Sequence, residues 1–427
     1  MTYEKFDDFE ISDSIKKAIS DMGFETTTPI QKLAIPEALR GCDITGQAQT
    51  GSGKTVAFSV PILQKIFIAD RSPQAIILCS TRELCLQISK EIVKMGANIK
   101  KLKVLAVYGG QPIGKQIRSL KKGVHIVVGT PGRVIDHIER GTLELIGVET
   151  VVLDEADEML DMGFRDDIEM ILRHTPRQRQ TMLFSATMNQ EVRKIAKMYQ
   201  INPKFIKVSS TRINTPKIKQ YYFKCDERDK FDVLNRLLTI YEPKLSLIFC
   251  NTKKRVDFLV KHLKREGYSV DSLHGDMTQK IRDKVMNKFR NGNIDMLVAT
   301  DVAARGIDVL NIDLVVNFDV PHDKDYYIHR IGRTARAGKN GHAFTLVSKY
   351  DEYHFSQILK ENRIQKKSVP SLSEMDEIKN NLLIENVKNS IKVDNLDKYI
   401  KIVKENASDE ISSTEIAAAL LKMIREN

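Results

Sequence analysis

Short runs of β-branched and aliphatic residues recur along this chain, and stretches of helical character separate them. Such near-continuous apolar strands, alternating with helices, predict parallel sheets that are covered on both faces. The runs are too many for one small sheet, so we expect an α/β protein with two sheet domains of the same architecture. The runs lie at 75–79, 104–107, 124–128, 151–153 and 181–184 in the first half, and at 246–250, 295–299, 314–318 and 343–347 in the second.

A polar stretch divides the two halves, and the end of the chain changes in character. Residues 208–216 are mostly polar and end in proline, which is typical of a linker. In the tail, two apolar stripes recur at helical spacing, and Ser412 and Glu415 can form a capping box before the second. We predict domains at 1–207 and 217–370, a linker at 208–216 and a helical extension at 371–427. The stripes are Leu396, Tyr399, Ile400 and Val403, and Ile416, Leu420, Leu421 and Ile424.

The charge of the chain bears on its partners. It has 67 Lys and Arg against 56 Asp and Glu, and a formal net charge of +11. Because residues 371–427 hold more acidic than basic side chains, the excess lies in the first 370 residues. A basic body attracts polyanions, with nucleic acid first, although a well-solvated surface explains the same charge equally well. Trp is absent and aromatic residues make up only 7%, which favours contacts to a phosphate backbone over base stacking.

The sequence also bears on the location of the protein. It has no apolar run of the ~18 residues that a transmembrane helix needs, and its first residues lack the basic and apolar regions of a secretory signal. The five cysteines are an odd number and none form a C-x-x-C pair. Disulfide scaffolds and zinc ribbons are therefore disfavoured, and we expect a cytoplasmic protein without a membrane partner.

A glycine-rich loop carries the first chemical signal. Residues 48–55 read Ala-Gln-Thr-Gly-Ser-Gly-Lys-Thr, which matches the P-loop pattern except for Ala48 at its first position. The loop follows a short apolar segment and precedes a helical one. Gly51 and Gly53 let backbone amides approach a phosphate, Lys54 can neutralise its charge, and the Thr55 hydroxyl can bind Mg²⁺. Taken alone, the pattern also fits a glycine turn with an incidental lysine.

Two acids at the end of a buried strand strengthen this interpretation. Asp154 and Glu155 directly follow the apolar run at 151–153. Asp154 suits Mg²⁺, partly through water, because Mg²⁺ prefers oxygen ligands and keeps part of its hydration shell. Glu155 suits polarisation of an attacking water. Acids at this position are otherwise often helix caps, but together with a P-loop they indicate hydrolysis of a nucleoside triphosphate.

Residues 154–157 read Asp-Glu-Ala-Asp, and with the motifs around them the chain resembles the DEAD-box RNA helicases over about residues 3–350. The resemblance implies two tandem RecA-like parallel-sheet domains plus a C-terminal helical extension, with ATP and Mg²⁺ as cofactors. It also implies an RNA-stimulated ATPase that binds single-stranded RNA across a cleft between the domains and separates short duplexes. Two arginines of the second half, Arg333 and Arg336, are implied to reach the γ-phosphate and complete the catalytic set of Lys54, Asp154 and Glu155.

The same resemblance assigns the remaining nucleotide contacts. Phe6 is implied to pack against adenine and Gln31 to bond its edge, with Phe24 in the same motif. The family's usual Pro-Thr-Pro is Thr-Thr-Pro at 27–29 here, which we expect to loosen the turn slightly while leaving Gln31 in place. The full implied nucleotide set is Phe6, Phe24, Gln31, Ala48, Gln49, Thr50, Gly51, Ser52, Gly53, Lys54, Thr55, Gly306 and Asp308.

RNA contacts and coupling residues follow from further motifs. Ser80 stands where the family usually has proline, and Ala335 where glycine is common; we expect the added methyl of Ala335 to be tolerated. The residues implied to grip RNA phosphates and sugars are Arg82, Gly110, Thr130, Arg133, Thr252, Arg282 and Thr300. The residues implied to link the two halves are Asp157, Ser185, Thr187 and His329. Singly, most of these are typical of surface or turn positions, and the interpretation rests on the set.

The tail resembles the helical dimerisation segment of bacterial cold-shock DEAD-box proteins, most closely at 417–421. This resemblance implies a homodimer through the C-terminal helices, and RNA-degradation or ribosome-assembly factors as further partners; packing of these helices on the second domain is an equal alternative. Such relatives often continue into a basic RNA-binding region, so we expect either a short member of the family or a chain that is truncated before that region. An ATP-gated RNA clamp and, less favoured, a DNA helicase are the competing functions.

Overall fold

The computed structural model describes most of the chain, and it divides into two compact units. One unit comprises Met1–Glu227 and Pro243–Lys367, and the other Arg228–Glu242 and Ser368–Asn427. Among the helices that the structure describes, none is long and apolar enough to cross a membrane. The described residues are 4–49, 51–208, 218–304, 309, 312–322, 324–335, 340–393, 396–407 and 411–426.

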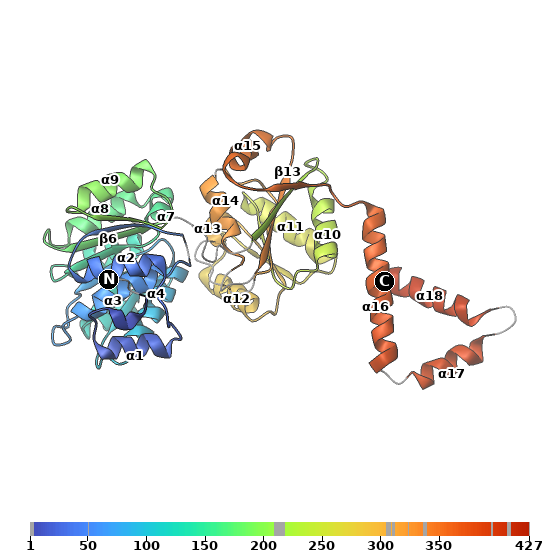
Figure 1. Cartoon of the computed structure of the whole chain (residues 1–427), viewed down its shortest axis with the longest axis horizontal. Helices are drawn as coiled ribbons and strands as arrows, with labels where there is room; N and C mark the ends of the chain where they lie inside the picture. Colours follow the sequence, from blue (N-terminus) through green and yellow to red (C-terminus); the bar gives the residue numbers. More distant parts are fainter. Residues whose placement is uncertain are drawn as a thin grey trace. The chain divides into compact units, whose positions relative to one another are not determined.

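The first sheet is built from seven parallel strands in the order β3-β4-β2-β5-β6-β1-β7. Figure 1 labels β6 of this sheet, with α8 and α9 on one side of it and α1 and α3 on the other. The register aligns the ends of the central strands, as in the pairing of Leu78 with Leu153. Since the strands are parallel, all their carboxyl ends lie at one edge of the sheet. The strands are β1 (Ile44–Gln47), β2 (Ala75–Leu78), β3 (Val104–Val107), β4 (Ile126–Gly129), β5 (Thr150–Leu153), β6 (Gln180–Ser185) and β7 (Lys204–Lys207).

Helices cover both faces of this sheet because side chains alternate along each strand. Ile77 packs in an apolar cluster with α1–α4, whereas its neighbours Ile76 and Leu78 pack in a second cluster with α6–α9. The helices are α1 (Asp13–Asp21), α2 (Pro29–Leu39), α3 (Lys54–Lys65), α4 (Arg82–Met95), α5 (Ile113–Lys121), α6 (Pro131–Glu139), α7 (Ala156–Asp161), α8 (Arg165–Arg173) and α9 (Gln190–Tyr199), preceded by a 3₁₀ turn, η1 (Phe6–Asp8).

The second sheet repeats this architecture with the order β10-β11-β9-β12-β13-β8-β14, again all parallel. Its core clusters join the strands to α12 and α13 and to α14 and α15. The strands are β8 (Ile218–Lys224), β9 (Ser246–Phe249), β10 (Val270–Leu273), β11 (Met296–Ala299), β12 (Leu314–Asn317), β13 (Gly341–Val347) and β14 (Gln365–Lys367). The helices are α11 (Lys253–Arg265), α12 (Gln279–Arg290), α13 (Asp301–Ala304), α14 (Lys324–Ile331) and α15 (Glu352–Glu361).

The smaller unit is helical. It consists of α10 (Lys230–Tyr241), α16 (Leu372–Val393), α17 (Asp397–Asn406) and α18 (Ser413–Glu426). Arg236 on α10 donates a hydrogen bond to the carbonyl of Pro370, just before α16. The capping box predicted before α18 is confirmed, because the backbone N–H of Ser412 donates to the Glu415 carboxylate and that of Glu415 donates to the Ser412 hydroxyl.

The predicted fold class of two tandem RecA-like sheets and a helical extension is confirmed, and all nine predicted runs lie on strands. Four strands were not predicted, namely β7, β8, β10 and β14, whereas β1 is the short apolar segment expected before the glycine-rich loop. Of the predicted linker, residues 209–216 lie outside the described residues, as do Thr50, Gly306, Asp308 and Arg336 of the candidate site. The exact domain boundaries stay a prediction.

Candidate functional site

The glycine-rich loop lies at the carboxyl edge of the first sheet, between β1 and α3. Gly51 and Gly53 both adopt positive φ, at 79° and 89°, a region that favours glycine. At Gly53 there is also no space for a side chain, because a Cβ would lie 2.3 Å from Nε2 of Gln31. Ala48 is buried, and its N–H donates to the carbonyl of Ser185 on β6. The carbonyl of Gln49 accepts hydrogen bonds from the N–H and hydroxyl of Ser52, which closes the turn.

Lys54 begins α3 with its side chain inside this loop. The residue is only 6% exposed, and among the described residues no group accepts a hydrogen bond from its Nζ. A buried ammonium without a partner is costly, so the pocket is suited to an anion. The N-terminus of α3, with its free amides and positive dipole end, favours a phosphate at the same place. Thr55, the next residue, is partly buried on the first turn of α3.

Asp154 and Glu155 follow β5, two strands from the glycine-rich loop in the sheet order. Both are buried, and the N–H of Glu155 donates to the Asp154 carboxylate at 3.0 Å. Burial raises the pKa of Asp154 to about 7; the Lys54 ammonium opposes this, and the Glu155 and Asp157 carboxylates add to it. A divalent cation at this place would stabilise the charged form of the Asp154 carboxylate, which burial and the neighbouring carboxylates disfavour.

The oxygen donors at this edge fit Mg²⁺. The Thr55 hydroxyl and the Asp154 carboxylate are ligands of the type that Mg²⁺ prefers, and Mg²⁺ commonly takes one or two carboxylates and completes its shell with water and substrate phosphate. Within the described part of the chain, no three His, Cys, Asp or Glu side chains form a cluster that could hold a metal ion. The hydroxyl and carboxylate oxygens at this edge are therefore of the type that fits Mg²⁺.

Ser80 is a contact that the sequence reasoning missed. Its hydroxyl follows β2 and donates a hydrogen bond to the Glu155 carboxylate at 3.2 Å, and both residues are buried. Glu155 itself adopts a positive φ of 51°, an uncommon conformation for a residue other than glycine. The side chain is therefore held from two sides, by its backbone and by Ser80. The signal in the sequence was the serine itself, which stands where the resembled family usually has proline.

Asp157 is connected to the loop after β6. Its Oδ2 accepts hydrogen bonds from the N–H of Thr187 at 2.8 Å and from the Thr187 hydroxyl at 3.1 Å. The Ser185 hydroxyl donates instead to the carbonyl of Thr187, at 2.6 Å. The structure thus brings Asp157, Ser185 and Thr187 together, with Thr187 making the direct contact to the acid.

Gln31 lies against the glycine-rich loop. Its Nε2 donates to the carbonyl of Gly53 at 3.1 Å, and its Oε1 accepts from the N–H of Thr28, so the Thr-Thr-Pro turn does hold it in place. Phe6 is buried in the core of the first domain, 6.1 Å from the ring of Phe9, and Phe24 is exposed. The adenine contacts implied for Phe6 and Gln31 stay predictions.

Of the four RNA candidates of the first domain, Arg82, Gly110 and Arg133 lie in one connected group. The guanidinium of Arg82 lies 4.8 Å from the centre of the Tyr108 ring and packs so closely on Gly110 that a Cβ there would collide with it. Arg133 donates to the carbonyl of Gln111 at 3.1 Å. Thr130, at the N-terminus of α6, donates its N–H to the carbonyl of Val107, at the end of β3. These positions all lie at the carboxyl edge of β2, β3 and β4.

In the second domain the RNA candidates also follow strand ends. Thr252 caps α11 after β9, and its hydroxyl accepts from the N–H of Arg255. Thr300 follows β11. Arg282 on α12 donates to the carbonyl of Ala303 at 3.2 Å and lies 3.5 Å from the Glu83 carboxylate of α4. Ligands of open parallel sheets bind beyond the carboxyl ends of the strands, which is where these residues lie.

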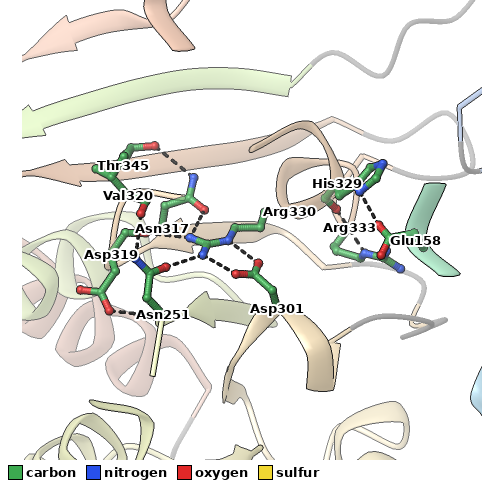
Figure 2. Close-up of polar contacts among 10 residues, drawn as sticks. All are labelled: Glu158, Asn251, Asp301, Asn317, Asp319, Val320, His329, Arg330, Arg333 and Thr345. Atoms are coloured by element: carbon green, nitrogen blue, oxygen red, sulfur yellow. Dashed lines mark hydrogen bonds and ion pairs between the residues drawn. The ribbon is translucent and has the colours of Figure 1, made fainter. Parts of the chain in front are cut away.

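Arg330 is the centre of a buried network that the sequence reasoning did not anticipate (Figure 2). It is 1% exposed, forms a two-pronged ion pair with Asp301 at 2.6 and 2.7 Å, and donates to Asn251 at 2.7 Å. It also donates to the carbonyl of Asp319 at 2.7 Å and to Asn317 at 3.3 Å. The network thereby ties α14 to the loops after β9, β11 and β12.

His329, next to Arg330, makes an ion pair with Glu158 on α7 of the first domain, 2.5 Å between Nδ1 and Oε1 (Figure 2). Burial opposes protonation of His329, but the Glu158 carboxylate outweighs it and raises the pKa of His329 above its ordinary value. Arg333, two residues after the end of α14, donates to the carbonyl of His329 at 3.3 Å. The contact of His329 is with Glu158, which directly follows the Asp-Glu-Ala-Asp tetrapeptide and was not among the predicted residues.

Three family models match successive parts of the chain. "DEAD/DEAH box helicase" matches residues 28–195, "Helicase conserved C-terminal domain" matches 229–338, and "RNA helicase DeaD dimerization domain" matches 370–427. Together they cover the glycine-rich loop, the second-domain network and the helical tail. The third model matches residues 370–427, which nearly coincide with the helical extension predicted at 371–427.

Whole proteins and solved structures are similar as well. The chain is 47% identical over 423 residues to "DEAD-box ATP-dependent RNA helicase CshA" of Geobacillus kaustophilus, covering 99% of this chain and 90% of that protein. It is 47% identical to "ATP-dependent RNA helicase CshA" of Listeria monocytogenes, covering 98% and 81%. S. cerevisiae Dbp5 bound to RNA and ADP BeF3 superimposes with a TM-score of 0.78 at 34% identity, covering 88% of this chain and 99% of that one. Mss116p bound to ssRNA and AMP-PNP gives 0.75 at 28% identity, covering 91% and 85%.

Proposed function

This chain belongs to the DEAD-box ATP-dependent RNA helicases, and from that premise we propose that it binds single-stranded RNA and separates short RNA duplexes in steps coupled to ATP hydrolysis. The observation that carries the proposal is the buried Lys54 ammonium, which has no hydrogen-bond acceptor among the described residues and lies in a glycine-rich loop beside the buried Asp154–Glu155 pair. A pocket of this kind is suited to the phosphates of a nucleotide.

We assign the nucleotide to the carboxyl edge of the first sheet. The amides around Gly51 and Gly53 and the Lys54 ammonium bind the phosphates, and Gln31 lies next to the loop for the adenine. Mg²⁺, where bound, is held by Thr55 and Asp154 and neutralises phosphate charge. Glu155, oriented by Ser80, accepts a hydrogen bond from the attacking water.

The second domain completes the reaction. We assign Arg333 and Arg336 to the γ-phosphate, where a guanidinium stabilises the charge of the transition state. His329 and Glu158 connect α14, which ends two residues before Arg333, to α7, which begins directly after Glu155. Closure of the two domains around ATP is therefore what assembles the full catalytic set.

RNA binds across the same two carboxyl edges. Arg82, Gly110, Thr130 and Arg133 contact it from the first domain, and Thr252, Arg282 and Thr300 from the second. Contacts to phosphate and 2′-hydroxyl groups select RNA without reading its sequence. Because both ATP and RNA favour the closed arrangement, each raises the affinity for the other by the same factor.

The tail and the cellular setting are part of the proposal. We assign α16–α18 to dimerisation with a second copy of the chain, in line with the dimerisation-domain match at 370–427. We place the protein in the cytoplasm, acting on RNA together with RNA-degradation or ribosome-assembly factors.

The decisive experiment uses Glu155→Gln. The amide keeps the shape of the side chain but cannot accept a proton, so the variant should bind ATP and RNA normally while RNA-stimulated turnover falls by about 10²-fold or more. ATPase and strand displacement are measured with and without RNA, and Glu144→Gln, a change at an exposed glutamate, serves as the matched control. Turnover of Glu155→Gln at the wild-type rate would refute the role assigned to Glu155. A wild-type ATPase rate that RNA does not change would refute the proposed function.

A further inference from the structure

We propose that the outer edge of the second sheet is an additional binding surface for single-stranded RNA, outside the site between the two domains. This surface, the lysine edge, consists of Lys224, Lys349, Lys366 and Lys367 together with the tyrosines Tyr350 and Tyr353. The proposal rests on the proposed function, because it takes RNA as the ligand of the main site.

The geometry of the edge strand places cations on both of its faces. β14 is the last strand of the sheet and pairs only with β8 in the strand order, with Lys366 opposite Tyr222 and Lys367 opposite Phe223. Neighbouring side chains of a strand point to opposite faces, and all three residues of β14 are exposed. Lys224 ends β8, so it lies beside them at the carboxyl edge.

On one face, three lysines lie near the Glu352 carboxylate. Lys224 Nζ lies 2.7 Å from the Glu352 carboxylate. The hydrogen bond and charge of Lys224 lower the pKa of Glu352, and the charges of Lys349 and Lys366 lower it further. Three lysines against Glu352 and the neighbouring Asp351 leave this face with an excess of positive charge, which attracts a polyanion.

The other face is basic as well. Lys367 Nζ lies 4.0 Å from the centre of the Tyr221 ring. Burial lowers the pKa of His342 on β13, and the nearby charges of Lys219 and Lys367 lower it further, against the opposing effect of Asp313. Lysine side chains therefore contribute positive charge on both faces of the sheet at this edge.

Two exposed aromatic rings add a second feature that suits RNA. Tyr350, next to Lys349, is 86% exposed, and Tyr353 on the first turn of α15 is 73% exposed. In combination with lysines, exposed rings match the surfaces that bind single strands, where phosphates contact cations and bases stack on rings. An acidic protein segment would use the lysines but not the rings.

The position of the lysine edge relative to the main RNA residues favours the same strand of RNA as occupant. Thr252 follows β9, whereas Lys367 ends β14, both at the carboxyl edge of one sheet. β12, β13 and β8 lie between these two strands, so the spacing is four times the roughly 4.8 Å between neighbouring strands, or about 19 Å. A single strand that continues out of the main site for a few nucleotides reaches this far.

The experiment compares a short RNA that fills the main site with the same RNA extended by a single-stranded tail at either end. The variant Lys349→Gln/Lys366→Gln removes two positive charges from exposed positions, and Lys100→Gln/Lys101→Gln is the matched control. Lys100 and Lys101 are also exposed, but they lie in the loop before β3, at the amino ends of the strands of the first sheet. RNA binding is measured by fluorescence anisotropy over a series of salt concentrations with a non-hydrolysable ATP analogue.

We expect the single-stranded RNA tail to increase the affinity of the wild type and of the control for RNA. The affinity of the Lys349→Gln/Lys366→Gln variant for the tailed RNA should be about 5- to 10-fold lower than that of the wild type. Loss of two phosphate contacts should also reduce the slope of log K against log salt by about 1.4, at about 0.7 for each contact to a single strand. Affinity for the short RNA and the ATPase it stimulates should not change. Tyr350→Ala/Tyr353→Ala, which alters no charge, should reduce the gain while leaving the salt slope unchanged.

Three results would overturn the proposal. The proposal is wrong if the RNA tail increases the affinity of the Lys349→Gln/Lys366→Gln variant as much as that of the wild type. It is also wrong if the control loses the same amount, which would indicate a general effect of charge. Thirdly, polyglutamate could bind the wild type but not the variant while the RNA tail has no effect, which would assign the surface to an acidic protein. Failure of the short RNA to stimulate the wild-type ATPase would instead refute the proposed function, so the two failures are distinguishable.

Discussion

Ser80 shows how one side chain can distinguish this chain from the pattern it resembles. Its hydroxyl donates to the Glu155 carboxylate at 3.2 Å in a buried position, and proline, usual at this place in the family, has no group that could do so. We infer that Ser80 is a positioning residue for Glu155, since it touches the carboxylate that is assigned to the attacking water.

We predict that Ser80→Ala lowers the RNA-stimulated kcat by about 10-fold, which corresponds to about 1.4 kcal/mol of transition-state stabilisation, because Glu155 loses the hydrogen bond that fixes its orientation. The KM for ATP should stay within about 2-fold, since no phosphate contact is removed. Steady-state ATPase assays measure both constants. Ser119→Ala is the control, because the Ser119 hydroxyl donates to the carbonyl of Lys115 in its own helix and has no other hydrogen bond to the described residues. An unchanged kcat in Ser80→Ala would mean that Glu155 is held without the serine.

Ala335 shows a residue that the sequence singled out for the right reason. It was noted as a methyl in place of the common glycine, and it is buried with φ at 57°, in the left-handed region that glycine adopts without strain. By contrast, the five hydrogen bonds of Arg330 join residues 251, 301, 317 and 319, which are far apart in the chain. No local pattern contains that information, because it arises only when the strand ends meet.

At the scale of elements, strands that are buried on both faces are the easiest to predict. β2, β5, β9 and β12 are buried on both faces, so their sequences are continuous apolar runs. β7 and β14 lie at sheet edges, where β7 has one buried residue and β14 has none, and their lysine-rich sequences give no strand signal. Their place in the fold comes from pairing with a neighbouring strand.

The α7–α14 contact is an element whose strength should depend on pH. The Glu158 carboxylate outweighs the effect of burial and holds the pKa of His329 above its ordinary value, with Asp157 adding to this and Arg333 opposing it. A raised histidine pKa means that the ion pair stabilises the contact fully below the ordinary pKa of about 6.5 and is lost as the pH rises through the raised value.

We therefore predict that Glu158→Gln lowers the RNA-stimulated kcat/KM by an amount that depends on pH. Relative to wild type, its RNA-stimulated kcat/KM should be reduced about 5-fold near pH 6, the size of a coupling of about 1 kcal/mol, and the difference should shrink as the pH rises past the raised pKa of His329. Taking the ratio of the two proteins at each pH removes every ionisation that they share. Glu144→Gln, far from His329 in sequence and exposed, should give a flat ratio of about 1. A Glu158→Gln ratio that is also flat would show that the contact does not depend on the charge of His329.

At the scale of the whole molecule, both sheets carry their candidate residues at the carboxyl edges of their strands. Lys54, Asp154 and Thr187 follow strands of the first sheet, and Thr252 and Thr300 follow strands of the second. The sequence could predict this placement because motif positions relative to apolar runs determine which edge they reach. It could not predict the division of the chain, in which α10, from between β8 and β9, belongs to the same compact unit as the tail helices.

The tail helices lead to a prediction about the assembly. α17 and α18 expose several large apolar side chains, among them Ile400, Leu420 and Met423. Exposed apolar residues gathered on a helical segment are typical of an interface, and a second copy of the chain is the partner that the match to a dimerisation domain supports. We predict that the full chain is a dimer at micromolar concentration.

Leu420→Asp/Met423→Asp should shift this equilibrium to the monomer. Burial of a leucine or methionine side chain contributes about 1.5–3 kcal/mol, so loss of even one should raise the dimer Kd by about 10-fold or more, while ATPase per chain remains unchanged because the catalytic residues lie in the other compact unit. Light scattering across a dilution series measures the equilibrium. Lys422→Gln, an exposed position on the same helix, is the control and should remain a dimer. If the wild type scatters as a monomer throughout the series, or if the double variant dimerises as tightly as the control, the apolar side chains of α18 do not form the interface between two copies.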